Sequence, residues 1–209
     1  MKRRTKSYVG SRPISTGALT RAIGGYQLDK ESQNFIVGNV IPAGTLAKRD
    51  EVTRKVSIVK TAKVASIDNG NKKIVTLEVS DFCSPIFAIG DKVLKAISGT
   101  FAAAPSITAI SDTESGYVIT LSAEISGLEA GDILQGVVAD DANASVILAN
   151  CVVVSDTMIS EEEVIVDVCV DTMQYAIYER RILPVASSQK TDDNFHLKGN
   201  PHIRFTFQQ

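Results

Sequence analysis

The chain has little of what most catalytic and metal sites are built from. Its 209 residues include no tryptophan, two histidines and three cysteines, and aromatic residues make up 6% of the sequence. His196 and His202 do not have the i, i+4 spacing that places two imidazoles on one helix face, and no cysteine lies near them. We therefore expect both histidines to occupy surface loops and expect no metal site.

Known catalytic motifs are also missing. The sequence contains no nucleophile elbow, no P-loop and no dinucleotide-binding fingerprint. Two acidic clusters, at residues 140–143 (DDAN) and 161–163 (EEE), lack the alternating oxygen ligands and the glycine bend of a calcium loop. A two-carboxylate sugar hydrolase would normally add aromatic platforms, which are scarce here. We expect no catalytic residue and no cofactor, so the chain is not expected to be an enzyme.

The cysteines and the hydrophobic runs set further limits. Cys83, Cys151 and Cys169 are odd in number, far apart and without C-x-x-C spacing, which favours reduced, buried thiols over a disulfide framework. No apolar run reaches 18 residues, so we expect no membrane-spanning helix. The start is basic like a signal peptide, but residues 7–21 supply no apolar core for one, and we expect no export.

Basic residues are absent from one long stretch. Residues 96–179 contain no lysine or arginine but fourteen Asp and Glu, whereas residues 1–95 hold seventeen basic and eight acidic residues. The net charge of the whole chain is only −2. Charge sorted in this way favours self-association or docking onto a charged assembly over binding of a small substrate.

β-strand patterns dominate the chain. Alternating or β-branched runs predict strands at residues 55–60, 73–79, 117–121, 146–148, 152–154, 163–170 and 203–207. Residues 68–71 (DNGN) predict a hairpin with a type I′ turn, because Asn and Gly tolerate positive φ. The best helix candidate is residues 171–180, although a strand at 174–178 fits nearly as well.

Three glycine-containing turns share one local pattern. Residues 41–46 (IPAGTL), 87–94 (FAIGDKVL) and 128–134 (LEAGDIL) each place an apolar residue before a tight turn, with a strand beginning just afterwards. In small β-barrels such a turn starts a new strand at a corner, with glycine in the φ > 0 position. We predict a compact barrel of two similar halves over residues 64–135.

The first 34 residues have a different composition. Residues 1–34 are rich in Ser, Thr and Gly and hold six basic residues before the first acidic one, Asp29. This composition predicts an extended arm with little structure of its own. Nucleic acid is not expected as its partner, because the rest of the chain is acidic and carries no aromatic pair of the RNA-binding type.

Several short motifs, in order along the chain, resemble tailed-phage head fibre proteins, which are related to lambda-type head decoration proteins. Residues 41–46 and 54–64 resemble the I-P-A-G-T-like opening of these families, and residues 87–91 (FAIGD) resemble an F-x-V-G-D segment. Residues 178–184 (YERRILP) and 201–205 (PHIRF) are similar to the family's closing motifs. The resemblance covers about residues 35–207.

The resemblance implies a mainly β fold in which a small barrel is inserted into a decoration-type base domain. The arm would be residues 1–34, the base would be formed by residues 35–63 and 136–209, and residues 64–135 would project outward. It further implies a non-enzymatic virion protein, made in the bacterial cytoplasm, that trimerises on the outer capsid surface and binds the major capsid protein.

Two groups of residues follow as candidate contacts. By analogy the arm reaches the capsid, and its candidate residues are Lys2, Arg3, Arg4, Lys6, Tyr8, Arg12 and Arg21. The acid-rich body needs counter-charge between subunits, and the candidate residues for that contact are Lys63, Asp167, Asp171, Arg180 and Arg181.

Two alternatives remain open at this stage. One is a carbohydrate- or receptor-binding adhesin, which would present exposed aromatic side chains at the outer barrel loops, where Phe101 and Tyr117 are the candidates. The other is a subunit of a polysaccharide-acting enzyme.

Overall fold

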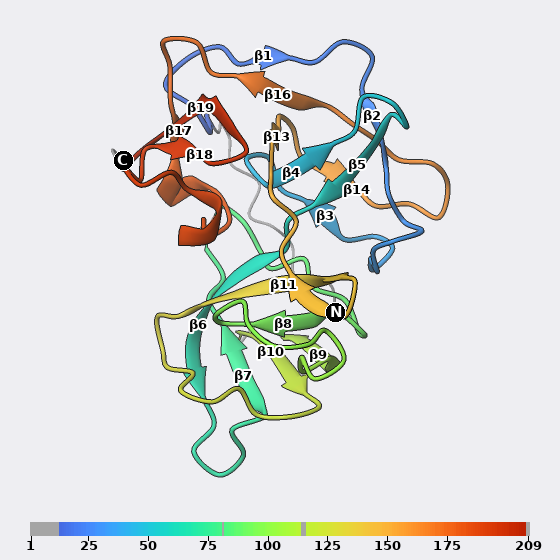
Figure 1. Ribbon diagram of the computed structural model, residues 1–209, viewed down its shortest axis with the longest axis vertical. Helices are drawn as coiled ribbons and strands as arrows, with labels where there is room; N and C mark the ends of the chain where they lie inside the picture. The colour runs from blue at the N-terminus through green and yellow to red at the C-terminus, as the bar shows by residue number, and fades with distance from the viewer. Residues whose placement is uncertain (1–12, 81, 114–115, 208–209) are drawn as a thin grey trace.

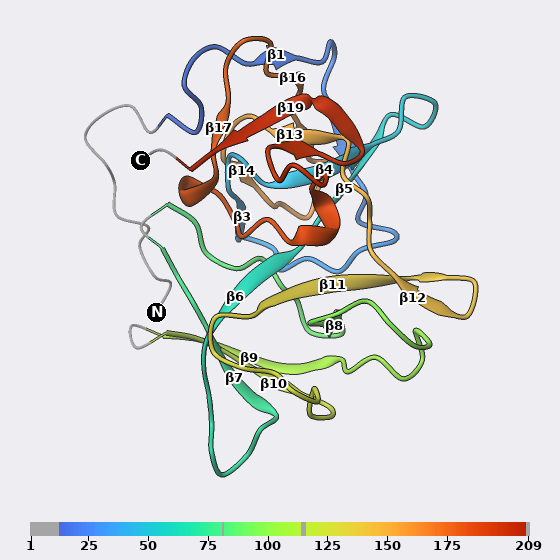
Figure 2. The same ribbon diagram turned by 60° about the vertical axis from the view of Figure 1, so that its left-hand side comes forward.

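The computed structural model describes residues 13–80, 82–113 and 116–207, and the chain folds mainly into β-strands, as the sequence predicts. Two units are visible in Figures 1 and 2. We call residues 13–60 and 146–207 the base and residues 61–145 the barrel. The chain enters the barrel once, after β5 (Lys55–Ile58), and leaves it once, after β12 (Asn143–Ser145). Among the described residues no helix is long and apolar enough to cross a membrane.

A seven-stranded sheet organises the base, in the order β1-β16-β13-β4-β5-β2-β15. Its strands are β1 (Thr20–Arg21), β2 (Tyr26–Leu28), β4 (Leu46–Arg49), β5 (Lys55–Ile58), β13 (Cys151–Val153), β15 (Ile165–Val166) and β16 (Val168–Asp171). Two smaller sheets complete the base. One pairs β3 (Val40–Ile41) with β14 (Thr157–Met158), and the other consists of β17 (Ile177–Tyr178), β19 (Asn200–Thr206) and β18 (His196–Leu197).

Both faces of the large sheet are covered, which explains why β13 reads as a continuous apolar run. Leu46 and Val152 pack on one side with Ile203 and Phe205 of β19. Their neighbours point to the opposite side, where Val153 packs in a second cluster. The period of two along a strand therefore divides one sequence run between two cores.

The barrel is a closed ring of antiparallel strands in the order β11-β6-β7-β10-β9-β8. Its strands are β6 (Thr61–Ile67), β7 (Ile74–Leu77), β8 (Lys92–Leu94), β9 (Ile107–Thr113), β10 (Gly116–Leu121) and β11 (Ile133–Asp140), with β12 (Asn143–Ser145) added to β11. The β8 strand closes the ring, because it pairs with β11 and because backbone hydrogen bonds join residues 90–93 to residues 105–107. Alternate residues of β7 and β10, such as Leu77, Tyr117 and Ile119, fill its interior.

The boundary between the units differs from the predicted one. The sequence ends the barrel at residue 135, but β11 continues to Asp140 and pairs with β12. The second segment of the base therefore begins after Ser145 and not at residue 136.

The predicted arm is wrong for residues 13–34. Ile14, Tyr26 and Leu28 are buried in the cores of the base, and β1 and β2 are strands of its large sheet. These strands are only two and three residues long, so they carry no periodic pattern by which the sequence could reveal them. Residues 1–12 lie outside the described part of the chain.

The predicted turn conformations were right at three glycines and wrong at the hairpin of residues 68–71. The three glycines of the predicted turns, Gly44, Gly90 and Gly131, do adopt positive φ, with values of 88°, 92° and 96°. The hairpin between β6 and β7 is present, but its turn type was predicted wrongly, since Gly70 does not have positive φ. Instead, the Asp68 carboxylate accepts hydrogen bonds from the backbone N–H groups of Gly70 and Asn71, both 2.8 Å long.

The helix predicted at residues 171–180 is also wrong. That segment contains the end of β16, the strand β17 and the start of the 3₁₀ turn η1 (Glu179–Arg181). A second 3₁₀ turn, η2 (Ser187–Gln189), follows in the base.

All three cysteine side chains are buried, as the sequence predicts. Burial raises the pKa of the Cys151 thiol to about 12 and also raises the pKa of Cys169. Because the thiolate is the reactive form, we expect a thiol reagent at pH 8 to modify almost none of the three cysteines in the native protein and all of them in denaturant. Titration with a chromogenic disulfide under both conditions measures this, and rapid labelling of the native protein would contradict it.

Candidate functional site

Predicted subunit contacts are largely paired within the chain. Asp167 forms an ion pair of 3.5 Å with Arg21, so a residue expected at the subunit interface meets a residue expected in the capsid-binding arm. Lys63 lies on β6 of the barrel and pairs with Glu78 at 3.0 Å. The Asp171 carboxylate accepts a hydrogen bond of 2.6 Å from its near neighbour Met173. These side chains do not form one cluster, since Lys63 belongs to a different unit from the others.

The two adjacent arginines of η1 have different surroundings. Arg181 donates a hydrogen bond of 3.0 Å to the Pro13 carbonyl, and its guanidinium lies 4.4 Å from the centroid of the Tyr178 ring. Arg180 is exposed and makes no ion pair with any residue that the structure describes. Of the predicted subunit contacts, all of which lie in the described part of the chain, Arg180 is the one whose side chain makes neither an ion pair nor a hydrogen bond with a described residue.

The candidate capsid contacts fall mostly outside the structure. The six that lie beyond the described residues are Lys2, Arg3, Arg4, Lys6, Tyr8 and Arg12. Arg21, the seventh, was predicted to lie in the arm but belongs to β1, a strand of the large base sheet.

The aromatic residues considered for an adhesin are not exposed platforms. Tyr117 is 2% exposed, and its hydroxyl donates a hydrogen bond of 3.1 Å to the Phe87 carbonyl inside the barrel. Phe101 is half-buried, and the Lys92 ammonium lies 4.5 Å from its ring centroid. Neither side chain offers the open aromatic face on which a sugar ring stacks.

Both acidic clusters lie in loops that connect other parts of the fold. Residues 140–143 form the turn between β11 and β12, where Asp141 has a positive φ of 50°. The loop at residues 161–163 is held by the Lys30 ammonium, which donates hydrogen bonds to the carbonyls of Ser160, Glu161 and Glu162. Within residues 13–80, 82–113 and 116–207, no group of three His, Cys, Asp or Glu side chains is arranged to hold a metal ion.

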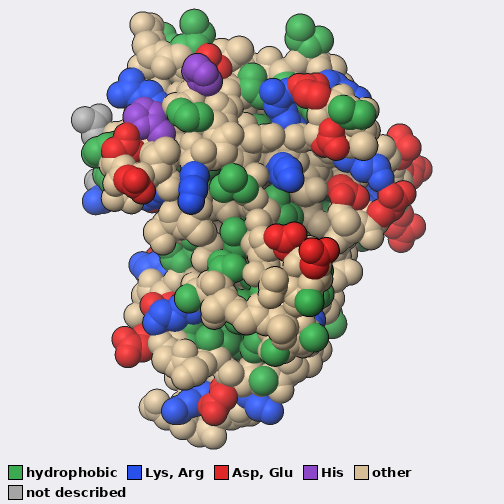
Figure 3. Space-filling model, in the orientation of Figure 1, with side chains coloured by type: hydrophobic (Ala, Val, Ile, Leu, Met, Phe, Trp, Pro, Cys, Tyr) green, Lys and Arg blue, Asp and Glu red, His purple; other side chains and the backbone are tan. Residues whose placement is uncertain are grey.

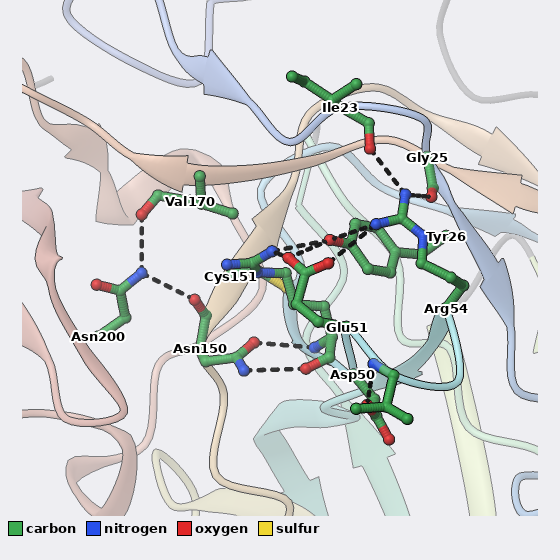
Figure 4. A network of polar contacts seen from close by, with 12 residues as sticks. Ile23, Gly25, Tyr26, Asp50, Glu51, Arg54, Asn150, Cys151, Val170 and Asn200 are labelled. Atoms are coloured by element: carbon green, nitrogen blue, oxygen red, sulfur yellow. Dashed lines mark hydrogen bonds and ion pairs between the residues drawn. The ribbon is translucent and has the colours of Figure 1, made fainter.

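A polar network that the sequence did not reveal centres on Tyr26 (Figure 4). The Tyr26 hydroxyl donates a hydrogen bond of 2.6 Å to Glu51, and it accepts hydrogen bonds from Arg49 and Arg54 at 2.8 and 3.2 Å. The Arg54 guanidinium carbon lies 4.1 Å from the centroid of the Tyr26 ring, and Glu51 forms ion pairs with both arginines. One buried phenol therefore joins β2 to both ends of the β4–β5 turn.

Arg54 also anchors the loop that precedes β2. Its guanidinium donates hydrogen bonds of 2.7 Å to the carbonyls of Ile23 and Gly25, and its own backbone has a φ of 58° (Figure 4). On the other side of the network, Asn150 exchanges two hydrogen bonds with the backbone of Arg49. The network therefore acts as a clamp that ties residues 23–26 to the turn between β4 and β5.

A second buried polar contact joins the base to the barrel. Lys60 lies between β5 and β6, and its ammonium is 2.7 Å from an Asp91 carboxylate oxygen. The same ammonium donates a hydrogen bond to the Asn34 carbonyl and lies 4.6 Å from the Phe35 ring centroid. Burial lowers the pKa of Lys60, while Asp91 opposes that shift. The pair borders a cleft of about 500 Å³ between the two units.

Three exposed large apolar residues, Ile36, Val37 and Ile89, lie close together where the units meet. Figure 3 shows hydrophobic side chains at the waist between base and barrel, and acidic side chains along the right-hand edge of the base. One groove of about 580 Å³ lies between residues 30–37 of the base, residues 88–89 of the barrel and residues 159–161 of the base. We call it the waist groove.

Comparison with known proteins gives no assignment: no protein-family model, no curated protein and no solved structure matches the chain.

Proposed function

We propose that the chain is a non-enzymatic structural protein that decorates the outer surface of a tailed-phage capsid as a trimer and binds the major capsid protein. The sequence motifs that resemble head fibre and head decoration proteins are the starting point for this proposal. The carbohydrate-binding alternative has less support, because the two aromatic residues on which it depends are buried or covered.

The path of the chain is the observation that supports the proposal best. Segments from both ends of the sequence build the base, and a closed barrel is inserted between them at β5 and β12 (Figure 1). This is the organisation that the resemblance implies for a protein that sits on a shell and projects a module outward. The motif at residues 41–46 also contacts the motif at residues 178–184, because Gly44 packs against Ile182.

Residues 1–12 are the proposed capsid contact. They contain five basic residues and no acidic residue. Basic segments of this kind gain order on binding, often by adding a strand to a partner's sheet. Because residues 13–34 belong to the base, the proposed docking segment is shorter than the arm expected from the sequence.

Deleting residues 2–12 is expected to abolish co-sedimentation with assembled heads of the particle that encodes this chain, while the protein stays folded. All strands described here lie between Thr20 and Thr206, so circular dichroism is expected to be unchanged. Reversing Lys2 and Arg3 to Glu is expected to weaken binding in the same assay. The matched control reverses Lys72 and Lys73, which are exposed in the β6–β7 turn of the barrel. Decoration by the truncated protein at the level of the full chain would rule out this docking segment.

A further inference from the structure

The waist groove has an apolar lining that no described part of the chain covers. Ile36, Val37 and Ile89 line it and are 37%, 50% and 60% exposed. Two of these side chains come from the base and one comes from the barrel, so the groove depends on both units. Large apolar side chains grouped in a concave surface indicate a binding site for another chain segment.

Three backbone N–H groups along one wall of the groove have no partner among the described residues. In the described parts of the chain, the N–H groups of Phe35, Ile36 and Val37 donate no hydrogen bond. These residues lie outside the named strands, where the Ile36 carbonyl accepts a hydrogen bond of 3.1 Å from the Asn39 N–H group in a turn before β3. A segment that lies against these residues can accept hydrogen bonds from their N–H groups as well as make apolar contact with their side chains.

The rim of the groove is acidic. Lys30 and Glu161 line it, but the Lys30 ammonium is held by three backbone carbonyls. The carboxylates of residues 161–163 are exposed and form no ion pair with any described residue. A segment that combines basic and apolar residues therefore complements both the rim and the floor of the groove.

We propose that the waist groove binds residues 1–12 of a second copy of this chain. That segment carries five basic residues and no acidic residue, with Tyr8 and Val9 as its apolar, strand-forming pair. Twelve residues span up to about 40 Å when extended, which is enough to leave one subunit and reach a neighbour. The inference rests on the proposed self-association and concerns the free protein: on a capsid, residues 1–12 would exchange the groove for the major capsid protein, and the shell would then hold the subunits together.

The test compares two isoleucine variants of the full chain. Ile89 lines the groove, whereas Ile165 lies on β15 outside it, and the two side chains are 60% and 57% exposed. We expect Ile89→Lys to convert the trimer to monomer in light scattering after size exclusion, and Ile165→Lys to leave the trimer intact. Reversing Lys2, Arg3, Arg4 and Lys6 to Glu is expected to act like Ile89→Lys.

A binding measurement distinguishes the inference from the proposed function. A fluorescent peptide of residues 1–12 is expected to bind the chain that lacks residues 1–12, and to bind at least tenfold more weakly when that chain also carries Ile89→Lys.

A stable trimer in all variants would overturn the groove assignment and leave self-association standing. A full chain that is monomeric at every concentration would overturn self-association and the inference with it. A monomer that binds the peptide only after truncation would show that the groove holds its own N-terminal segment, which also contradicts the proposal.

Discussion

Replacing Lys60 with methionine is expected to lower the free energy of unfolding by about 3–5 kcal/mol. The Lys60 and Asp91 side chains are 4% and 11% exposed, and their charged groups are 2.7 Å apart. Methionine fills similar space but leaves the Asp91 carboxylate buried without its cation. Asp91 would keep the hydrogen bond from the Ala88 N–H group, which is 2.8 Å long and cannot replace the lost charge.

An exposed pair on the next strand serves as the matched control. Lys63 and Glu78 are 3.0 Å apart, with side chains 46% and 51% exposed. Lys63→Met is expected to change stability by no more than about 1 kcal/mol, because water screens such pairs. Urea unfolding at pH 7 measures both variants. The double variant Lys60→Met, Asp91→Leu is expected to recover much of the loss, since it removes the unpaired charge.

An equal effect of Lys60→Met and Lys63→Met would contradict this account of the junction. Because Lys60 joins β5 to β6 and Asp91 lies in the turn before β8, the pair also fixes how the barrel sits on the base. Limited proteolysis of Lys60→Met is therefore expected to cut first near the junction. Cleavage confined to the barrel hairpins would show that the units stay docked without the ion pair.

The parts of the fold that the sequence predicted are those with a local cause. Alternation predicted strands at residues 73–79 and 117–121, where β7 and β10 lie, because side chains in a strand point alternately in and out. The turn glycines were predictable because few other residues tolerate a positive φ. The prediction of an unstructured arm was wrong for residues 13–34 for the opposite reason. The strands there are short, and they are held by contacts with distant residues, such as the hydrogen bond from Arg54 to the Gly25 carbonyl.

The candidate sites depended on contacts between distant residues, which composition does not contain. Charge sorting indicated that Asp167 needs a cation, but it could not show that Arg21 of the same chain supplies one. The partner of Lys60 was hidden for the same reason, since Asp91 belongs to a different strand connection. The waist groove was also hidden, because it forms only when the base and the barrel come together.

Replacing Gly44 with alanine is expected to lower the free energy of unfolding by about 2–6 kcal/mol, from backbone strain and overpacking of about 1–3 kcal/mol each. Gly44 has a φ of 88°, and an added Cβ would lie 2.0 Å from Cγ2 and 2.9 Å from Cβ of Ile182, a buried residue. Gly131→Ala is the matched control, because its φ is 96° but nothing lies within 4 Å of an added Cβ. Gly131→Ala should therefore show the strain alone, about 1–3 kcal/mol, and chemical denaturation measures both variants.

If the two variants lose the same stability, the contact between residue 44 and Ile182 does not restrict position 44 to glycine. A larger loss for Gly44→Ala would mean that glycine is needed there for close packing as well as for the turn, and that this packing holds the two distant segments of the base together.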